Sequence, residues 1–84
     1  MKLTLHGEQI SSVRDFYKII EEQLDAPDYF GENLDALYDI LTDYVSPPEV
    51  EIYEILALGE GIGAMYLLRF MAMVTDCGGE VRIR

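Results

Sequence analysis

The sequence predicts a single small α/β domain, residues 1–84, built around a parallel sheet. Short runs in which apolar residues alternate with polar ones are separated by longer segments with apolar residues at helical spacing. Strands separated by helices favour parallel pairing. Half of the residues are apolar, which is enough for one packed core in a chain of 84 residues.

The chain begins with a predicted strand and a predicted helix. Residues 3–5, Leu-Thr-Leu, alternate like a short strand, which stops at His6-Gly7. Ser11 or Ser12 can cap the first helix, because a serine hydroxyl accepts a hydrogen bond from a free amide of the first turn. The apolar positions of this helix recur at helical spacing: Val13, Phe16, Tyr17, Ile20 and Leu24. Pro27 ends the segment.

A second helix is predicted to begin after Asn33, another good capping residue. Its apolar positions recur at intervals of three and four: Leu34, Leu37 and Leu41. Pro47-Pro48 must stop this helix, because proline has no amide hydrogen to donate.

The second half of the chain predicts a strand, a helix and a final strand. Residues 50–56 alternate apolar side chains with Glu51 and Glu54, which predicts a strand. Gly59 and Gly61 are expected to end this strand. Residues 62–75 are apolar almost all round, which is typical of a helix buried between other elements. The methionines of this helix are expected in the core: Met65, Met71 and Met73. A Gly78-Gly79 turn leads into the last strand, residues 80–84.

The charge of the chain is concentrated in one block. The fifty residues between Lys18 and Arg69 contain no Lys or Arg but twelve Asp and Glu, and the net charge of the chain is -10. Such a one-sided field attracts cationic partners and speeds their encounter, so electrostatic steering toward a basic protein is expected. The same field repels phosphates, which argues against direct binding of nucleic acid.

The second helix carries part of this charge on one face. At about 100° per residue its three leucines fall within roughly 60° of one another. The opposite side carries Asp35, Asp39, Thr42 and Asp43. Tyrosines flank this face: Tyr29, Tyr38 and Tyr44. Aromatic residues beside charged ones suit a protein interface, although a solvated acidic face is the plain alternative, and Tyr44 lies near the apolar sector and could belong to the core.

The stretch from Tyr29 to Thr42, which contains Gly-Glu-Asn-Leu-Asp-Ala-Leu, resembles the barstar family of intracellular inhibitors of secreted microbial ribonucleases. The earlier Gly7-Glu8-Gln9-Ile10 and the later Pro48 are also similar to that family, so the resemblance covers about residues 3–53. It implies a three-stranded parallel sheet packed by three to four helices. This chain looks shorter than the family between the second strand and the last helix, so the third helix is expected to be reduced to a turn around residues 57–61.

The resemblance also implies a function and roles for individual residues. The chain would inhibit a secreted microbial, guanyl-preferring ribonuclease, barnase-like or related, in a 1:1 complex. The acidic loop and helix, residues 29–44, would mimic RNA phosphate, with Asp39 facing the enzyme's catalytic Arg and His groups and Asp35 meeting a neighbouring donor. Tyr29 would stack on the catalytic histidine. The contact around them would be completed by Tyr38, Thr42 and Tyr44, and Asp43 extends the same face.

One alternative function stays open. The type member of the family has Trp at the positions of Tyr38 and Tyr44 and a small residue at that of Asp43, so this chain could be an acidic immunity or interaction module with a different basic partner. Catalysis is disfavoured, because one convex helix offers no cleft that separates two carboxylate pKa values.

The sequence also lacks the patterns of several kinds of site and signal. One cysteine excludes an internal disulfide, and a reducing cytoplasm is expected, with no export signal and no membrane span. We expect a monomer when free. No cofactor or metal is expected, because His6 has no partner at ligand spacing and the three aspartates do not follow a calcium-loop pattern.

Overall fold

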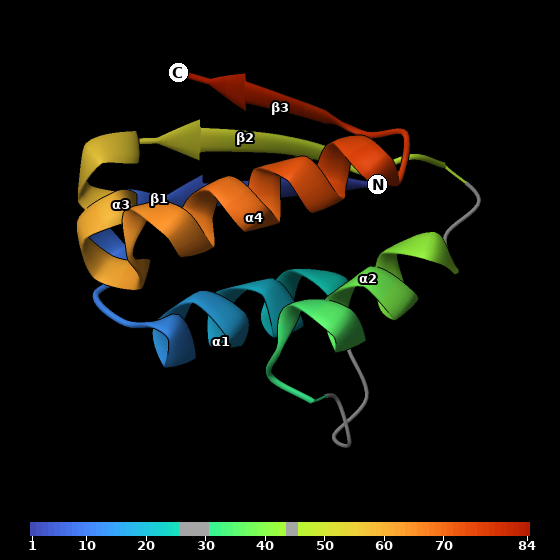
Figure 1. The fold of residues 1–84 in the computed structure, drawn as a ribbon, viewed down its shortest axis with the longest axis horizontal. Helices are drawn as coiled ribbons and strands as arrows, with labels where there is room; N and C mark the ends of the chain where they lie inside the picture. The colour runs from blue at the N-terminus through green and yellow to red at the C-terminus, as the bar shows by residue number, and fades with distance from the viewer. Residues whose placement is uncertain (26–30, 44–45) are drawn as a thin grey trace.

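The computed structural model describes residues 1–25, 31–43 and 46–84. These residues contain one sheet of three parallel strands. The strands lie in the order β1 (Lys2–His6), β2 (Glu49–Tyr53) and β3 (Glu80–Ile83). The helices of the described residues are α1 (Val13–Leu24), α2 (Leu34–Thr42), α3 (Ile55–Ile62) and α4 (Ala64–Asp76), with a short 3₁₀ turn, η1 (Gly7–Gln9). Figure 1 shows the helices gathered on one side of the sheet. The predicted α/β fold is confirmed.

The two faces of the sheet differ in polarity. The register places buried apolar residues side by side on the face that meets the helices: Leu3 with Val50, and Leu5 with Ile52. On the opposite face Glu51 is only 8% exposed and is held by Lys2 at 2.6 Å and by Arg84 at 2.7 Å. One buried carboxylate of the central strand therefore ties together the first residue of β1 and the residue that follows β3.

Helix α1 begins where the sequence predicts and packs against α4. The Ser12 hydroxyl accepts a hydrogen bond from the Asp15 amide at 3.1 Å, which caps the first turn. Phe16 meets Phe70 of α4 edge to face, with ring centroids 5.0 Å apart. The buried Tyr17 hydroxyl is hydrogen-bonded to the hydroxyl of Tyr66, also on α4. Helix α1 also contacts the sheet directly, because the Gln23 side chain accepts a hydrogen bond from the Thr4 amide at 2.8 Å and donates one to the Thr4 carbonyl at 2.7 Å.

The predicted second strand is too long at its end, and the third helix is not reduced to a turn. Strand β2 ends at Tyr53, and Glu54 adopts the left-handed conformation, φ 54° and ψ 57°, which turns the chain out of the sheet. Helix α3 then runs from Ile55 to Ile62 with Gly59 and Gly61 inside it. The apolar spacing of Ile55, Leu58 and Ile62 fits a helix, and packing overrides the low helix propensity of the two glycines.

The last helix is also shorter and less buried than predicted. It starts at Ala64, after Gly63 with φ 92°, and Ile62 belongs to α3. Met73 lies in the core and Met71 is half-buried, but Met65 is 72% exposed and Leu68 is 55% exposed. The prediction of a helix buried all round, with a methionine stripe in the core, is therefore wrong for the face that carries Met65 and Leu68.

Among the described residues no single helix has the length and apolar character needed to cross a membrane. Within the same described residues, α3 and α4 taken together have that length and apolar character, but they are bent by 111° at their junction.

Candidate partner-binding site

Helix α2 is held in place by its N-cap residue, Asn33, and by three leucines. The side chain of Asn33 accepts a hydrogen bond from the Ala36 amide at 2.8 Å, which caps the helix as the sequence predicts. Such a cap contributes about 1 kcal/mol to helix stability. The leucines on the inner side are nearly inaccessible to solvent: Leu34 is 9%, Leu37 0% and Leu41 2% exposed. This anchoring fixes the direction in which the outer side of α2 points.

The outer side of α2 is acidic, as the angular analysis predicts. We call five exposed residues of α2 and its C-cap the acidic surface: Asp35, Tyr38, Asp39, Thr42 and Asp43. Tyr38 is 40% exposed and is the one aromatic residue of this surface. The structure therefore brings together five of the seven residues that the sequence predicts as a partner-binding site. The other two, Tyr29 and Tyr44, lie outside the described residues.

Across the described part of the chain, the carboxylates of the acidic surface form no ion pair with a base of their own chain. Within the described residues the ion pairs involve Glu51 and Glu80, and none involves Asp35, Asp39 or Asp43. Like charges four residues apart destabilise a helix by roughly 0.2 to 0.5 kcal/mol per pair. Asp43 adds to this cost because it lies at the negative end of the helix dipole. These unpaired charges are left available for a partner.

Negative charge also gathers where the chain enters α2. Glu32, in the loop before α2, contacts Glu21 of α1. Desolvation and the adjacent Glu32 carboxyl raise the pKa of Glu21 above its ordinary value. A cationic partner that docks beside this loop would relieve the repulsion between the two carboxylates.

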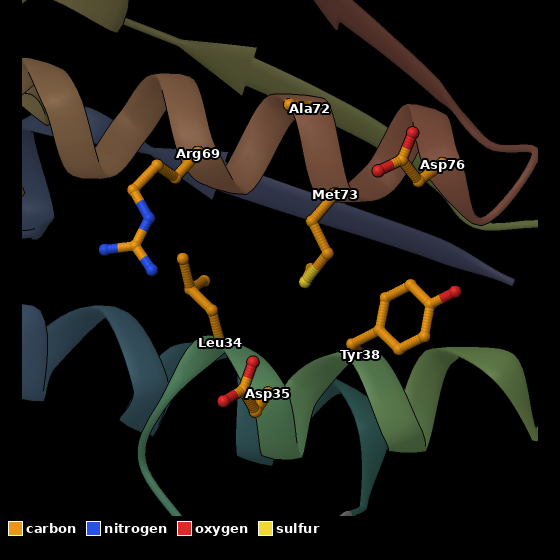
Figure 2. A pocket seen from close by; sticks show the side chains of 7 residues that line it. All are labelled: Leu34, Asp35, Tyr38, Arg69, Ala72, Met73 and Asp76. Atoms are coloured by element: carbon orange, nitrogen blue, oxygen red, sulfur yellow. The ribbon is translucent and has the colours of Figure 1, made fainter.

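A groove between α2 and α4 adjoins the acidic surface. It has a volume of about 270 Å³ and is lined from α2 by Leu34, Asp35 and Tyr38, and from α4 by Arg69, Ala72, Met73 and Asp76. We call it the α2–α4 groove. Figure 2 shows Arg69 extending from α4 toward α2 at one end and Asp76 at the other, with Met73 between them.

The residues that α4 brings to this groove are absent from the predicted site. Arg69, Met73 and Asp76 are spaced four and three apart, so they share one side of a helix, but the sequence does not show that this side packs on α2. The sequence leaves open whether Asp76 or Glu80 belongs to the site. The structure places Asp76 in the groove, whereas Glu80 lies on β3 and pairs with Arg82 at 3.5 Å.

The acidic surface suits contact with a basic region of another macromolecule. Across the part of the chain that the structure describes, no group of three or more His, Cys, Asp and Glu side chains could hold a metal ion. The acidic surface lies on the exposed side of one helix, which is convex. Fixed, outward-facing carboxylates of this kind are complementary to a basic cleft on another macromolecule.

Comparisons with known proteins agree with this chemistry. The family model described as "Barstar (barnase inhibitor)" matches residues 1–59, which include β1, α1, α2 and β2. A Bacillus subtilis (strain 168) protein named "Putative ribonuclease inhibitor YrdF" is 38% identical to this chain over 47 residues. The aligned segment covers 56% of this chain and 52% of that protein, so the chain spans about half the length of this relative.

Proposed function

The chain belongs to the barstar family, and from this premise we propose that it is a protein inhibitor of a secreted microbial, guanyl-preferring ribonuclease. The loop and helix at residues 29–44 would cover the active site of the enzyme in a 1:1 complex. One observation carries the proposal: the carboxylates of the acidic surface point outward and, within the described residues, pair with no base of this chain.

The proposed mechanism is mimicry of the RNA backbone. A ribonuclease active site binds phosphate with cationic side chains, and a carboxylate placed there satisfies those cations without offering a bond to cleave. Asp39, at the middle of the acidic surface, would take the place of the phosphate, and Asp35 would meet a neighbouring donor. Tyr29 would stack on the catalytic histidine. The surrounding contact would come from Tyr38, Thr42, Asp43 and Tyr44.

The rigidity of α2 supports this mechanism. The Asn33 cap and the three buried leucines fix the helix before the partner arrives, so little conformational freedom is left to lose on binding. The net charge of -10 would also draw a basic enzyme toward the inhibitor and raise the association rate. Inhibition by this mechanism requires binding alone and no catalysis by the chain.

Inhibition of a panel of secreted microbial ribonucleases, barnase included, tests the proposal. We expect at least one enzyme to be inhibited with a dissociation constant in the nanomolar range, which corresponds to about -12 kcal/mol. The stoichiometry at saturation should be one to one.

The alternative is an acidic module that binds a different basic protein, and Tyr38, Asp43 and Tyr44 favour it because they depart from the family's type member. The same panel separates the two functions. If the chain inhibits none of the enzymes, ribonuclease inhibition is rejected and the alternative is favoured.

A further inference from the structure

Arg69 is the only base between Lys18 and Arg82 in the sequence, and the fold brings it beside the acidic surface. It lines the α2–α4 groove together with Asp35, a member of that surface. In Figure 2 its guanidinium extends from α4 toward α2 next to Leu34. The surface that a partner meets at this end of α2 is therefore not uniformly negative.

Arg69 forms no ion pair within the described residues, although Asp35 and Asp76 line the same groove. By contrast, three other bases are each paired with a carboxylate: Lys2, Arg82 and Arg84. Arg69 is an exposed residue, and its planar fork of N–H donors extends into the opening of the groove beside Leu34 (Figure 2). That fork matches a carboxylate with two parallel hydrogen bonds.

The rest of the groove can receive the stem of an acidic side chain. Leu34 and Met73 are each 9% exposed and give the groove an apolar lining beside Arg69. A glutamate from a partner could lay its methylene groups on these residues and place its carboxylate on Arg69. A cationic side chain in the same position would meet Arg69 at close range, and such like-charge contacts suppress wrong partners.

We propose that Arg69 is a specificity-determining residue, which selects a partner that presents a carboxylate to the α2–α4 groove beside its otherwise cationic cleft. This inference rests on the proposed function, because it describes which ribonucleases the acidic surface can accept. Asp39 would supply recognition of the cationic site. Because Asp35 and Asp76 line the same groove, Arg69 would act only at its own end of the groove, where it would favour enzymes that place a carboxylate there over enzymes that place a base there.

Substitution of Arg69 tests the inference on the most tightly bound ribonuclease of the panel. We expect Arg69→Gln to weaken binding about tenfold, the effect of losing a charge-assisted hydrogen bond, and Arg69→Glu to weaken it further. Arg69→Lys keeps the charge but loses the two-donor fork, so its effect should be smaller than that of Arg69→Gln. Arg14→Gln removes the same charge from an exposed position of α1 outside the groove and serves as the matched control.

A double-mutant cycle then identifies the partner group. Each Asp and Glu around the active-site cleft of that enzyme is replaced in turn by its amide and combined with Arg69→Gln. One of these pairs should couple by at least about fivefold in the dissociation constant, because the two residues contact one another. Tighter binding of Arg69→Gln, a change of less than about threefold, or no coupled pair would overturn the inference.

The outcome for Asp39→Ala separates this inference from the proposed function. If Asp39→Ala weakens the complex while every Arg69 variant binds like the unaltered chain, ribonuclease inhibition stands and the role of Arg69 is rejected. If no enzyme of the panel is bound, both are rejected. Thermal unfolding of each variant shows whether a weaker complex reflects a folding defect.

Discussion

At the scale of single residues, the structure separates carboxylates that hold the fold from carboxylates left for a partner. Glu51 lies on the central strand, is nearly buried and is paired twice, to Lys2 and Arg84. Asp35 and Asp39 lie on α2, are exposed and pair with no described base. Both kinds occur in the same acidic block of the sequence, and only their neighbours in the fold distinguish them.

Glu51 should make the stability of the fold depend on pH. Hydrogen bonds from Lys2 and then from Arg84 hold the pKa of Glu51 below its ordinary value of 4.5. A lowered pKa in the folded state adds stability above the unfolded pKa, and this stability is lost as the pH falls through the folded pKa. We therefore expect Glu51→Gln to destabilise the protein at pH 7 and to have a smaller effect at pH 3.

Urea unfolding of both proteins at the two pH values measures this difference. Glu49→Gln is the matched control, because Glu49 is exposed on the same strand and has no ion pair in the described residues. An equal loss of stability from Glu51→Gln at pH 7 and pH 3 would contradict the assignment of Glu51 as a charged anchor.

At the scale of elements, capping residues and apolar spacing predict α1 and α2 well, but the same kind of local pattern does not predict α3. Ser12 and Asn33 mark the helix starts because capping chemistry is local, and the leucine spacing of α2 gives its buried side. In α3 two glycines predict a break, but they lie inside the helix. The reason is tertiary: a Cβ on Gly61 would lie 2.0 Å from the Ile10 carbonyl oxygen, so only glycine allows this approach.

The two glycines of α3 should respond oppositely to alanine. Gly61→Ala forces the backbone at Ile10 to move and should destabilise the protein by about 1 to 3 kcal/mol. Among the described residues a Cβ on Gly59 meets only Leu67, at an ordinary 3.7 Å, so Gly59→Ala should gain helix propensity and stabilise the protein by up to about 1 kcal/mol. Chemical denaturation of the two variants measures both effects, and stabilisation by Gly61→Ala would show that α3 does not pack on Ile10 in this way.

At the scale of the whole molecule, the sequence predicts the charge asymmetry and the class of fold but not the assembled site. The acidic side of α2 follows from its own periodicity, and so five site residues could be placed in advance. The α2–α4 groove depends on how α4 packs on α2, and the pairing of helices is not encoded in the spacing within either one. Arg69 could therefore be recognised only after the fold was known.

The overall charge predicts how association responds to salt. The Debye length shrinks from about 30 Å at 0.01 M ionic strength to about 8 Å at 0.15 M, which screens an exposed acidic surface. The association rate with an inhibited ribonuclease should fall steeply over this range while the dissociation rate changes much less. Stopped-flow kinetics measure both rates, and an association rate independent of salt would argue against steering by the net charge.

The most direct test of the central claim, that the acidic surface occupies a ribonuclease active site, is the dissociation constant of Asp39→Ala with an inhibited enzyme. We expect a loss of at least tenfold, roughly 1.4 kcal/mol, and a larger loss than from any other single truncation on α2. Glu60→Ala removes one exposed charge from α3 and should change the constant little. Equal, small effects of Asp39→Ala and Glu60→Ala would contradict the claim.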